Sequence, residues 1–181
     1  MNIEETLLPG LLVLTPKIYC DDRGAFSETF NLRRMAEAGL PTAWVQDNFS
    51  TSRKNVLRGI HYQIEQPQGK LVRVTHGAVL DVAVDLRRSS AKFGKHVAME
   101  LSAENGRMLW IPEGFGHAFL VLSDVAGFAY KVTDYYSPKE ERTVLWNDPV
   151  LGIDWGVSAD EAILSAKDAV GLPFKDAEVF A

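Results

Sequence analysis

The fold of this chain is decided by the stretch Leu71-Val72-Arg73-Val74-Thr75-His76-Gly77-Ala78-Val79-Leu80-Asp81-Val82-Ala83-Val84-Asp85-Leu86. Apolar residues alternate with others on both sides of His76-Gly77, which we expect to form a turn. Successive side chains of a β-strand point to opposite faces, so this alternation predicts two strands, at 71–75 and 79–86. In the second strand one face carries Leu80, Val82, Val84 and Leu86, and the other carries Asp81, Ala83 and Asp85.

Short alternating runs of the same kind extend over most of the chain, from Leu12 to Leu145. Glycine, proline and asparagine separate them, and short strands at such spacing favour a β-sandwich or barrel over alternating β-α-β units. The further strands that we predict are Gly24–Phe30, Ala43–Phe49, His96–Leu101, Arg107–Ile111, His117–Leu122, Gly127–Thr133 and Thr143–Trp146.

Helix signals are few. Asn31 is a good N-cap for a helix over Leu32–Ala38, which Gly39 would end. The run Ser158-Ala159-Asp160-Glu161 has the spacing of a capping box and predicts a second short helix. No repeat, low-complexity segment or linker interrupts the chain. We therefore expect one all-β domain over residues 1–181, with a few short peripheral helices.

The composition is that of an ordinary globular chain, with 181 residues of which 46% are hydrophobic and 24% charged. A net charge of −5 argues against a nucleic-acid-binding protein, although a pocket can still concentrate basic side chains around an anion. Cys20 is the only cysteine, which excludes an intrachain disulfide and fits a reducing compartment. The acidic start Met1–Glu5 lacks a signal-peptide pattern, and no apolar run is long enough to span a bilayer. We expect a cytoplasmic protein with no nucleic-acid or membrane partner.

The clearest chemistry lies in the run Val56–Gln63. Arg58 precedes His61 by three residues, and Gly59 between them gives the backbone the freedom to bring both side chains to one cavity. Imidazole is the natural proton acceptor near neutral pH, and guanidinium binds phosphate through two hydrogen bonds. The run therefore predicts a base beside an anion site, with a buried core histidine as the alternative interpretation. The functional interpretation gains weight from two further polar donors, Gln63 and Lys70, which a plain core rarely gathers.

His117 ends the run Pro112-Glu113-Gly114-Phe115-Gly116-His117, which resembles the second histidine motif of the cupin superfamily. The first cupin motif has the pattern His-X-His, whereas this chain has His61-Tyr62-Gln63, so an amide replaces one metal ligand. Zinc and iron sites need three or four nitrogen, sulfur or carboxylate ligands. Glu65 would complete such a set only by pointing inward. We therefore expect no metal.

Other candidates have a structural and a functional interpretation. Tyr130 and Tyr136, six residues apart in one predicted strand, would share a face. The structural interpretation is that both are ordinary strand aromatics. If they line a cavity instead, one could donate a proton and the other could stack on a planar base. The chain has neither GxGxxG nor GxxxxGK(S/T), so a nucleotide would have to bind in the mouth of a barrel. The remaining polar positions end strands or helices unless a shared cavity gathers them: Arg23, Glu28, Gln46, Asp47, Asn48, Lys167 and Asp168.

A resemblance to a known family rests on segments that follow one another over nearly the whole chain. These segments are Asp22–Glu28, Gln46–Asn48, Val56–Gln63, Gln68–Val72, Asp81–Asp85, Leu101–Asn105, Trp110–Phe119, Tyr130–Lys131, Tyr136–Pro138, Trp146–Asp148 and Leu164–Asp168. In this order they closely resemble the dTDP-4-dehydrorhamnose 3,5-epimerase family. The resemblance implies a double-stranded β-helix, the cupin or jelly-roll barrel, and an isomerase of dTDP-L-rhamnose biosynthesis.

The resemblance also implies roles for individual residues. His61 matches the family's proton acceptor, Asp168 the carboxylate that orients it, and Tyr130 the proton donor on the opposite face of the sugar. Lys70 matches the cation beside the C4 oxygen, and Tyr136 the ring that stacks on thymine. Substrate-contacting positions match Arg23, Glu28, Gln46, Asp47, Asn48, Arg58, His117, Glu141 and Lys167. In this family the segment with Arg23 and Glu28 crosses to the neighbouring subunit of a homodimer.

The implied reaction is an epimerisation at C3 and C5 of dTDP-4-dehydro-6-deoxy-D-xylo-hexulose that needs no cofactor. Both carbons flank the C4 ketone, so a base can remove a proton from one face while an acid returns one to the other. Three alternatives stay open: an epimerase that inverts only C3 or only C5, a metal-dependent cupin, and a non-catalytic module that binds nucleotide sugars.

Two small-residue changes depart from the family pattern. The usual Gly-Phe-Ala-His-Gly-Phe run is here Gly114-Phe115-Gly116-His117-Ala118-Phe119, and Gly156 follows Trp155 where proline is usual. Both changes leave the proposed catalytic groups in place. We expect them to tune the shape of the pocket.

Overall fold

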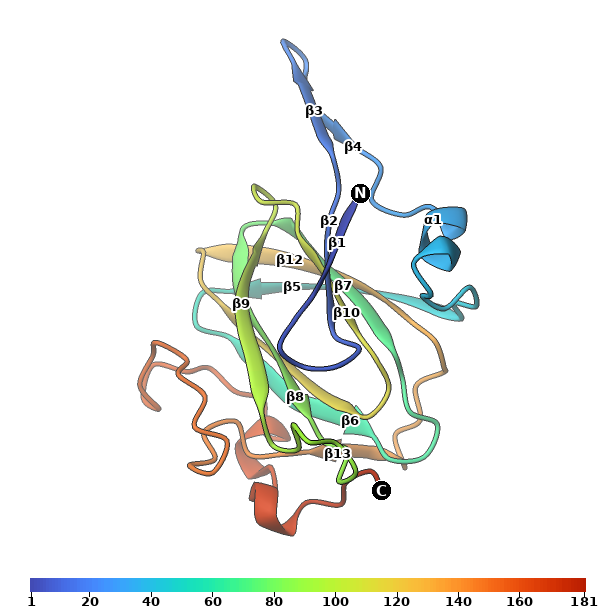
Figure 1. Cartoon of the computed structure of the whole chain (residues 1–181). Helices are drawn as coiled ribbons and strands as arrows, with labels where there is room; N and C mark the ends of the chain where they lie inside the picture. Colours follow the sequence, from blue (N-terminus) through green and yellow to red (C-terminus); the bar gives the residue numbers. More distant parts are fainter.

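Two antiparallel β-sheets face each other in the computed structural model, which describes residues 1–181 (Figure 1). The first sheet has six strands in the order β1-β2-β10-β7-β12-β5. Its strands are β1 (Asn2–Glu5), β2 (Leu12–Thr15), β10 (Met108–Ile111), β7 (Lys70–His76), β12 (Val125–Val132) and β5 (Gln46–Arg53).

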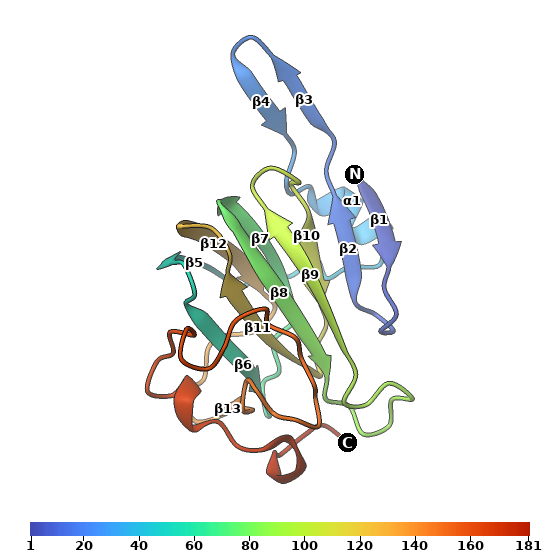
Figure 2. The ribbon, with the colours of Figure 1, turned by 90° about the vertical axis from the view of Figure 1, so that its left-hand side faces the viewer.

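The second sheet has five strands in the order β13-β6-β11-β8-β9. Its strands are β13 (Glu141–Thr143), β6 (Leu57–Gln63), β11 (Phe115–Val121), β8 (Ala78–Asp85) and β9 (His96–Ser102). A separate hairpin of β3 (Ile18–Asp21) and β4 (Gly24–Ser27) extends away from both sheets (Figure 2). The predicted all-β architecture is confirmed.

The two faces of β8 serve two different hydrophobic cores. Val79 and Ala83 belong to a cluster between the sheets, whereas Val82 and Val84 belong to a second cluster on the outer face of the five-stranded sheet. Each buried aliphatic side chain of this size stabilises the fold by about 1.5–3 kcal/mol. The predicted turn at His76-Gly77 carries the chain from one sheet to the other, because β7 and β8 lie in different sheets.

Irregular segments and one helix cover the outer faces. The C-terminal segment packs Trp146 and Trp155 against the five-stranded sheet, as part of the second cluster. On the six-stranded sheet a third cluster joins Met35 of α1 to Leu71 and Trp110. Both sheets are therefore buried on two sides where these covers lie, which explains why several strands are nearly continuous in apolar residues.

Helix α1 (Leu32–Glu37) has the predicted N-cap, because the Asn31 side chain accepts a hydrogen bond from Arg34 N–H. The remaining helical elements are two 3₁₀ turns, η1 (Asp168–Val170) and η2 (Phe174–Asp176). The helix predicted from Ser158 is wrong. Its capping hydrogen bonds to Glu161 do form, but Ile163 N–H then donates to Asn55 carbonyl, so the chain leaves the turn to pair with β6.

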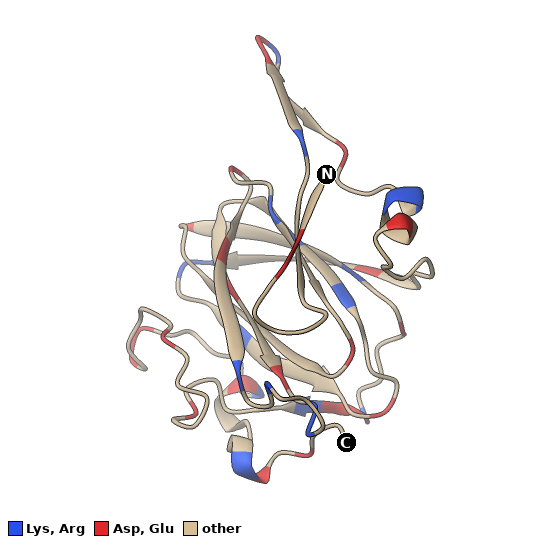
Figure 3. Cartoon of the chain, viewed as in Figure 1, with Lys and Arg blue, Asp and Glu red and all other residues tan.

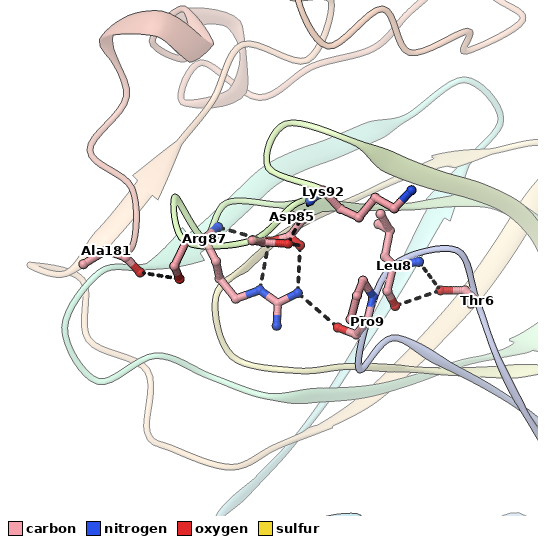
Figure 4. A network of polar contacts seen from close by, with 9 residues as sticks. Thr6, Leu8, Pro9, Asp85, Arg87, Lys92 and Ala181 are labelled. Atoms are coloured by element: carbon pink, nitrogen blue, oxygen red, sulfur yellow. Dashed lines mark hydrogen bonds and ion pairs between the residues drawn. The ribbon is translucent and has the colours of Figure 1, made fainter.

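A polar network fastens the N-terminal loop to the end of β8 (Figure 4). The Asp85 carboxylate, fully buried, accepts hydrogen bonds from Arg87 Nε and Nη2 at 2.9 and 2.7 Å and from Ser90 Oγ at 2.6 Å. Arg87 Nη2 also donates to the Pro9 carbonyl at 3.0 Å. The buried charge of Asp85 is thus fully paired, so we assign this network a structural role at the end of β8.

Acidic and basic residues are mixed along the ribbon, including the tip of the β3–β4 hairpin (Figure 3). None of the helices has the length and apolar character needed to cross a membrane.

Candidate active site

A cavity of about 380 Å³ lies between the two sheets. Strands β5, β7 and β12 form one wall, and strands β6, β11 and β13 form the other. Most of the predicted site residues share this cavity although the chain separates them widely. They are His61, Tyr130, Lys70, Gln46, Asn48, Arg58, His117, Tyr136, Glu141 and Lys167.

An irregularity in β6 brings Arg58 and His61 to the same side. In the ladder with β11, His61 pairs with His117 and Arg58 pairs with Phe119, so β6 has one residue more than its partner between the two pairs. Gly59 makes this possible, with a φ of 115° and no room for a Cβ, which would lie 2.5 Å from the His117 carbonyl oxygen. The convergence expected from the glycine is confirmed.

His61 and Asp168 form a tight pair at the cavity wall. The His61 Nε2–H donates to Asp168 Oδ1 at 2.5 Å, which leaves the lone pair on Nδ1. Ser165 Oγ donates to the other carboxylate oxygen at 2.7 Å. Although burial raises the pKa of Asp168, the hydrogen bonds from His61 and Ser165 outweigh it and keep that pKa below its ordinary value. The carboxylate is therefore charged and orients the ring.

The protonation of His61 favours a base. Burial lowers its pKa, against the opposing effect of Asp168, and the positive charges of Lys167 and Lys70 lower it further. The imidazole is therefore neutral at neutral pH and able to accept a proton.

Lys70 and Tyr130 approach the cavity from the opposite sheet. Burial lowers the pKa of Lys70 to about 8, while the carboxylates of Glu141 and Asp81 act in the other direction. Burial raises the pKa of Tyr130, and Glu141 adds to the effect. At neutral pH the site therefore holds an ammonium beside a protonated phenol.

Tyr136, Glu141 and Lys167 form a chain of hydrogen bonds at the cavity edge. The Tyr136 hydroxyl donates to Glu141 Oε2 at 3.0 Å, and Lys167 Nζ donates to Oε1 at 2.7 Å. Although burial raises the pKa of Glu141, the contact with Lys167 prevails and lowers it. Tyr136 does not continue the strand of Tyr130, because β12 ends at Val132, so the prediction that both share a strand face is wrong. Both nevertheless line the cavity.

His117 has a partner that the sequence did not suggest. Its Nε2 lies 3.0 Å from Oδ2 of Asp81, a fully buried carboxylate whose Oδ1 has no hydrogen bond. The His117 ring stacks on Phe128 with a centroid distance of 5.9 Å. A signal for this pair existed in the sequence, because a carboxylate on the inner face of a strand must find a partner.

The cavity is rich in positive charge although the chain is acidic. Arg58, Lys70 and Lys167 face a single carboxylate of the wall, that of Glu141. Arg58 Nε and Nη2 both donate to Ser52 Oγ at 3.1 Å, which fixes the plane of the guanidinium. Such a cavity suits a ligand with a negatively charged group.

Three predicted substrate contacts lie outside the cavity of this chain. Asp47 points to the other face of β5 and pairs with Lys131 Nζ at 2.9 Å. Arg23 pairs with Asp21 at the tip of the β3–β4 hairpin, and Glu28 pairs with Arg34. Within one chain these residues do not reach the other candidates.

Metal-ligand geometry is absent from the chain, which has no group of three or more His, Cys, Asp or Glu side chains able to hold an ion. Glu65, the third ligand considered from the sequence, is exposed and does not line the cavity. Gln63, at the position of the missing cupin histidine, does not line it either.

Comparison with known proteins decides the family. The family model described as dTDP-4-dehydrorhamnose 3,5-epimerase matches residues 5–176. The chain belongs to the dTDP-4-dehydrorhamnose 3,5-epimerase family. It is 52% identical over 181 residues to the dTDP-4-dehydrorhamnose 3,5-epimerase of Pseudomonas aeruginosa, with 99% of each chain covered. The isomerase class predicted from the motifs is confirmed, as is the assignment to dTDP-L-rhamnose biosynthesis.

Solved structures extend this result. The dTDP-6-deoxy-D-glucose-3,5-epimerase of Legionella pneumophila, solved with dTDP-4-keto-L-rhamnose, has a TM-score of 0.94 and 49% identity, with 98% of this chain and 94% of that chain covered. The predicted cupin fold is thereby confirmed. A 3′-monoepimerase of Streptomyces bikiniensis, solved with dTDP-quinovose, has a TM-score of 0.87 and 34% identity, covering 94% and 86% of the two chains.

The departures from the pattern of this epimerase family lie outside the cavity. A Cβ at Gly116 would come 2.5 Å from Cγ2 of Ile60, on the face of β11 opposite to His117. Ala118 shares that face and packs in the outer cluster. Gly156 has a φ of 69° and no close neighbour to a Cβ. None of the three lines the cavity, so an effect of these changes on the shape of the pocket would be indirect and stays a prediction.

Proposed function

We propose that this chain inverts C3 and C5 of dTDP-4-dehydro-6-deoxy-D-xylo-hexulose to give dTDP-4-dehydro-L-rhamnose, without a cofactor, with His61 as the base and Tyr130 as the acid. The observation that carries the proposal is the His61–Asp168 pair in the wall of a cavity that also holds Lys70 and Tyr130. The bound ligand of the Legionella pneumophila relative belongs to the same class of dTDP-linked 4-keto sugars.

Proton removal falls to His61. Its free Nδ1 takes the proton from the carbon next to the C4 ketone, and the electrons of the broken C–H bond move into the ketone to form an enolate. Asp168 stabilises the imidazolium that results, because its carboxylate is held in the charged form by Ser165 and His61 itself. The lowered pKa of His61 keeps the imidazole unprotonated before the reaction.

Lys70 stabilises the enolate. Its buried ammonium carries the positive charge that the C4 oxygen needs as it becomes negative. Tyr130 then gives its phenolic proton to the other face of the same carbon, which inverts the centre. The raised pKa of Tyr130 keeps that proton in place until the enolate forms. Solvent reprotonates Tyr130 and His61 loses its proton, so the cycle is complete without redox change.

Substrate binding uses the rest of the cavity. Arg58 and Lys167 neutralise the pyrophosphate, since a guanidinium and an ammonium both bind phosphate oxygens well. Tyr136 stacks on the thymine ring at the cavity edge. The polar residues that complete the contacts are Gln46, Asn48, His117 and Glu141.

The remaining predicted contacts require a second copy of the chain. The β3–β4 hairpin extends from the body of the molecule and exposes Ile18, Tyr19 and Phe26, which is unusual for a surface hairpin (Figure 2). A homodimer in which this hairpin reaches the neighbouring cavity would cover these side chains and bring Arg23 and Glu28 to the substrate. We also infer that residues 1–181 act as one domain, in the cytoplasm, where the exposed Cys20 stays reduced.

The experiment that tests the proposal is incubation of purified enzyme with dTDP-4-keto-6-deoxyglucose in deuterated water, followed by NMR of the sugar. Deuterium at both C3 and C5, with formation of the L-rhamno product, supports the double epimerase. Deuterium at one carbon alone overturns it in favour of a monoepimerase, the class to which the Streptomyces bikiniensis relative belongs. Stoichiometric metal in the active protein, with loss of activity to a chelator, would overturn the cofactor-free mechanism.

A further inference from the structure

Gln63 is a buried polar residue beside the cavity. It has no role in the reaction proposed above. It lies on β6 two residues after His61, so both side chains share a face of the strand. Only 4% of its surface is exposed, and it is not part of the cavity wall. A buried amide at such a place must have hydrogen-bond partners.

Those partners are backbone groups of the loop that carries Tyr136. Gln63 Oε1 accepts a hydrogen bond from Ser137 N–H at 2.8 Å, and Nε2 donates to the Tyr135 carbonyl at 3.2 Å. Nε2 also donates to the Gln66 carbonyl at 2.7 Å. The amide therefore holds the residue before Tyr136 and the residue after it.

The Tyr136 ring is held from the neighbouring strand. Its hydroxyl donates to Glu141, and Glu141 is the register partner of Gln63 in the β6–β13 ladder. Tyr136 is 50% exposed, so packing alone does little to fix its position. Gln63 holds the backbone on both sides of Tyr136, and Tyr136 N–H itself donates to Gln46 Oε1 at the longer distance of 3.4 Å. The tip of the ring depends on Glu141.

We propose that Gln63 is a positioning residue for nucleoside binding, which fixes the loop over residues 135–137 so that Tyr136 presents its ring to the base of the substrate. The inference rests on the proposed function, in which Tyr136 is the stacking platform. It assigns to Gln63 an effect on the affinity for the nucleotide and none on proton transfer at the sugar.

The physical reason is that the amide satisfies a donor and an acceptor of the loop at once. Without it, Ser137 N–H and the Tyr135 carbonyl lose their partner, and the loop must move toward water to regain hydrogen bonds. The stacking geometry of Tyr136 is then no longer the preferred one, and each binding event has to restore it.

The test compares Gln63→Ala and Gln63→Glu with the wild type. The glutamate variant keeps the side-chain volume and the acceptor for Ser137, and loses the donor. The measurements are the Kd of dTDP by calorimetry, and kcat and KM for the 4-keto sugar. We expect Kd and KM to rise about tenfold, within the range known for loss of base stacking, while kcat stays nearly unchanged.

Asn105→Ala is the matched control, because this amide also makes three hydrogen bonds to the backbone of a turn, here with Ser102, Arg107 and Glu100. Asn105 does not line the cavity. A similar loss of dTDP affinity in Asn105→Ala would show general destabilisation and overturn the proposal.

A double-mutant cycle separates this inference from the proposed function. Tyr136→Ala should weaken dTDP binding, and adding Gln63→Ala to it should weaken binding no further, because Gln63 acts through Tyr136. Additive losses, or a Gln63 variant with wild-type Kd, would overturn the positioning role. Failure of the wild type to epimerise would instead overturn the proposed function, and the dTDP cycle would still decide the role of Gln63.

Discussion

The site contains two histidine–aspartate pairs that differ in their surroundings. His61 and His117 are direct neighbours in the β6–β11 ladder, and both line the cavity. Asp168, the partner of His61, accepts additional hydrogen bonds from Ser165 Oγ and Gly59 N–H. Asp81, the partner of His117, has one oxygen without any hydrogen bond.

We infer that this difference separates a pair that transfers protons from a pair that orients the substrate. A carboxylate with several donors stays charged and stabilises an imidazolium as it forms. The Asp81 carboxylate, with its single contact at 3.0 Å, holds the ring of His117 where it stacks on Phe128. Asp85 shows that several donors alone do not make such a pair, because that carboxylate is saturated by Arg87 and Ser90 and has no histidine partner.

The largest expected effect is at the histidines themselves. His61→Asn should lower proton exchange at C3 and C5 by about 10³-fold, because a general base supplies about 10²–10⁴-fold. His117→Asn should leave kcat within a few-fold and raise KM about tenfold, as expected for a lost hydrogen bond to a charged substrate group. If His61→Asn and His117→Asn lost kcat equally, the two histidine–aspartate pairs would not differ in function as we infer.

The aspartates should show the next largest difference. Asp168→Asn keeps a hydrogen-bond acceptor for His61 and removes the charge, so kcat should fall by about 10²-fold, within the range of general-base catalysis. Asp81→Asn should lower kcat/KM by about tenfold or less, the size of one hydrogen bond. Steady-state kinetics with thermal unfolding as a control would check both, and a larger effect at Asp81 would reverse our assignment.

The pH dependence of kcat/KM tests His61 and Lys70, the cation that shares its cavity. The rate should rise as His61 loses its proton, with a midpoint below the ordinary pKa because burial lowers it. It should fall again near pH 8, as Lys70 loses the proton that the enolate needs, because burial lowers its pKa to about 8. Lys70→Arg, which stays charged, should remove this alkaline fall; an unchanged profile would exclude Lys70 as its cause.

The smallest effect should come from Ser165, which contacts only the first pair. Ser165→Ala removes the hydrogen bond that Ser165 Oγ donates to the Asp168 carboxylate and the one that it accepts from Asp168 N–H. Since only the first acts directly on the carboxylate, we expect kcat/KM to fall about fivefold, or about 1 kcal/mol. Ser158→Ala removes a comparable hydrogen bond to the exposed Glu161 and should leave the rate unchanged. A Ser165→Ala variant with wild-type kcat/KM would show that Asp168 does not need this donor.

Alternation of side chains in the sequence predicted the sheets well, because burial on defined faces imposes a period of two. The helix predicted from Ser158 does not form, because a long-range pairing of Ile163 with Asn55 ends it after one turn. The strands of the N-terminal hairpin expose most of their residues, so their pattern was weak and β3 was not predicted.

Local sequence and family resemblance located the cavity residues, and contacts between distant segments decided the rest. Asp47 alternates with Gln46 and Asn48 along β5 and so points away from the cavity. Asp81 and Gln63 find their partners 36 and 74 residues away in the chain, which no local pattern reveals. The roles of Asp81 and Gln63 could be inferred only from the structure, which identifies their hydrogen-bond partners.

The most direct test of a base on one face and an acid on the other is solvent-deuterium exchange in Tyr130→Phe beside His61→Asn, followed at C5 by NMR. Without the acid, His61 still removes the proton and returns deuterium to the same face, so Tyr130→Phe should exchange without inversion. His61→Asn should do neither. Exchange at the wild-type rate in His61→Asn, or inversion at the wild-type rate in Tyr130→Phe, would contradict the account.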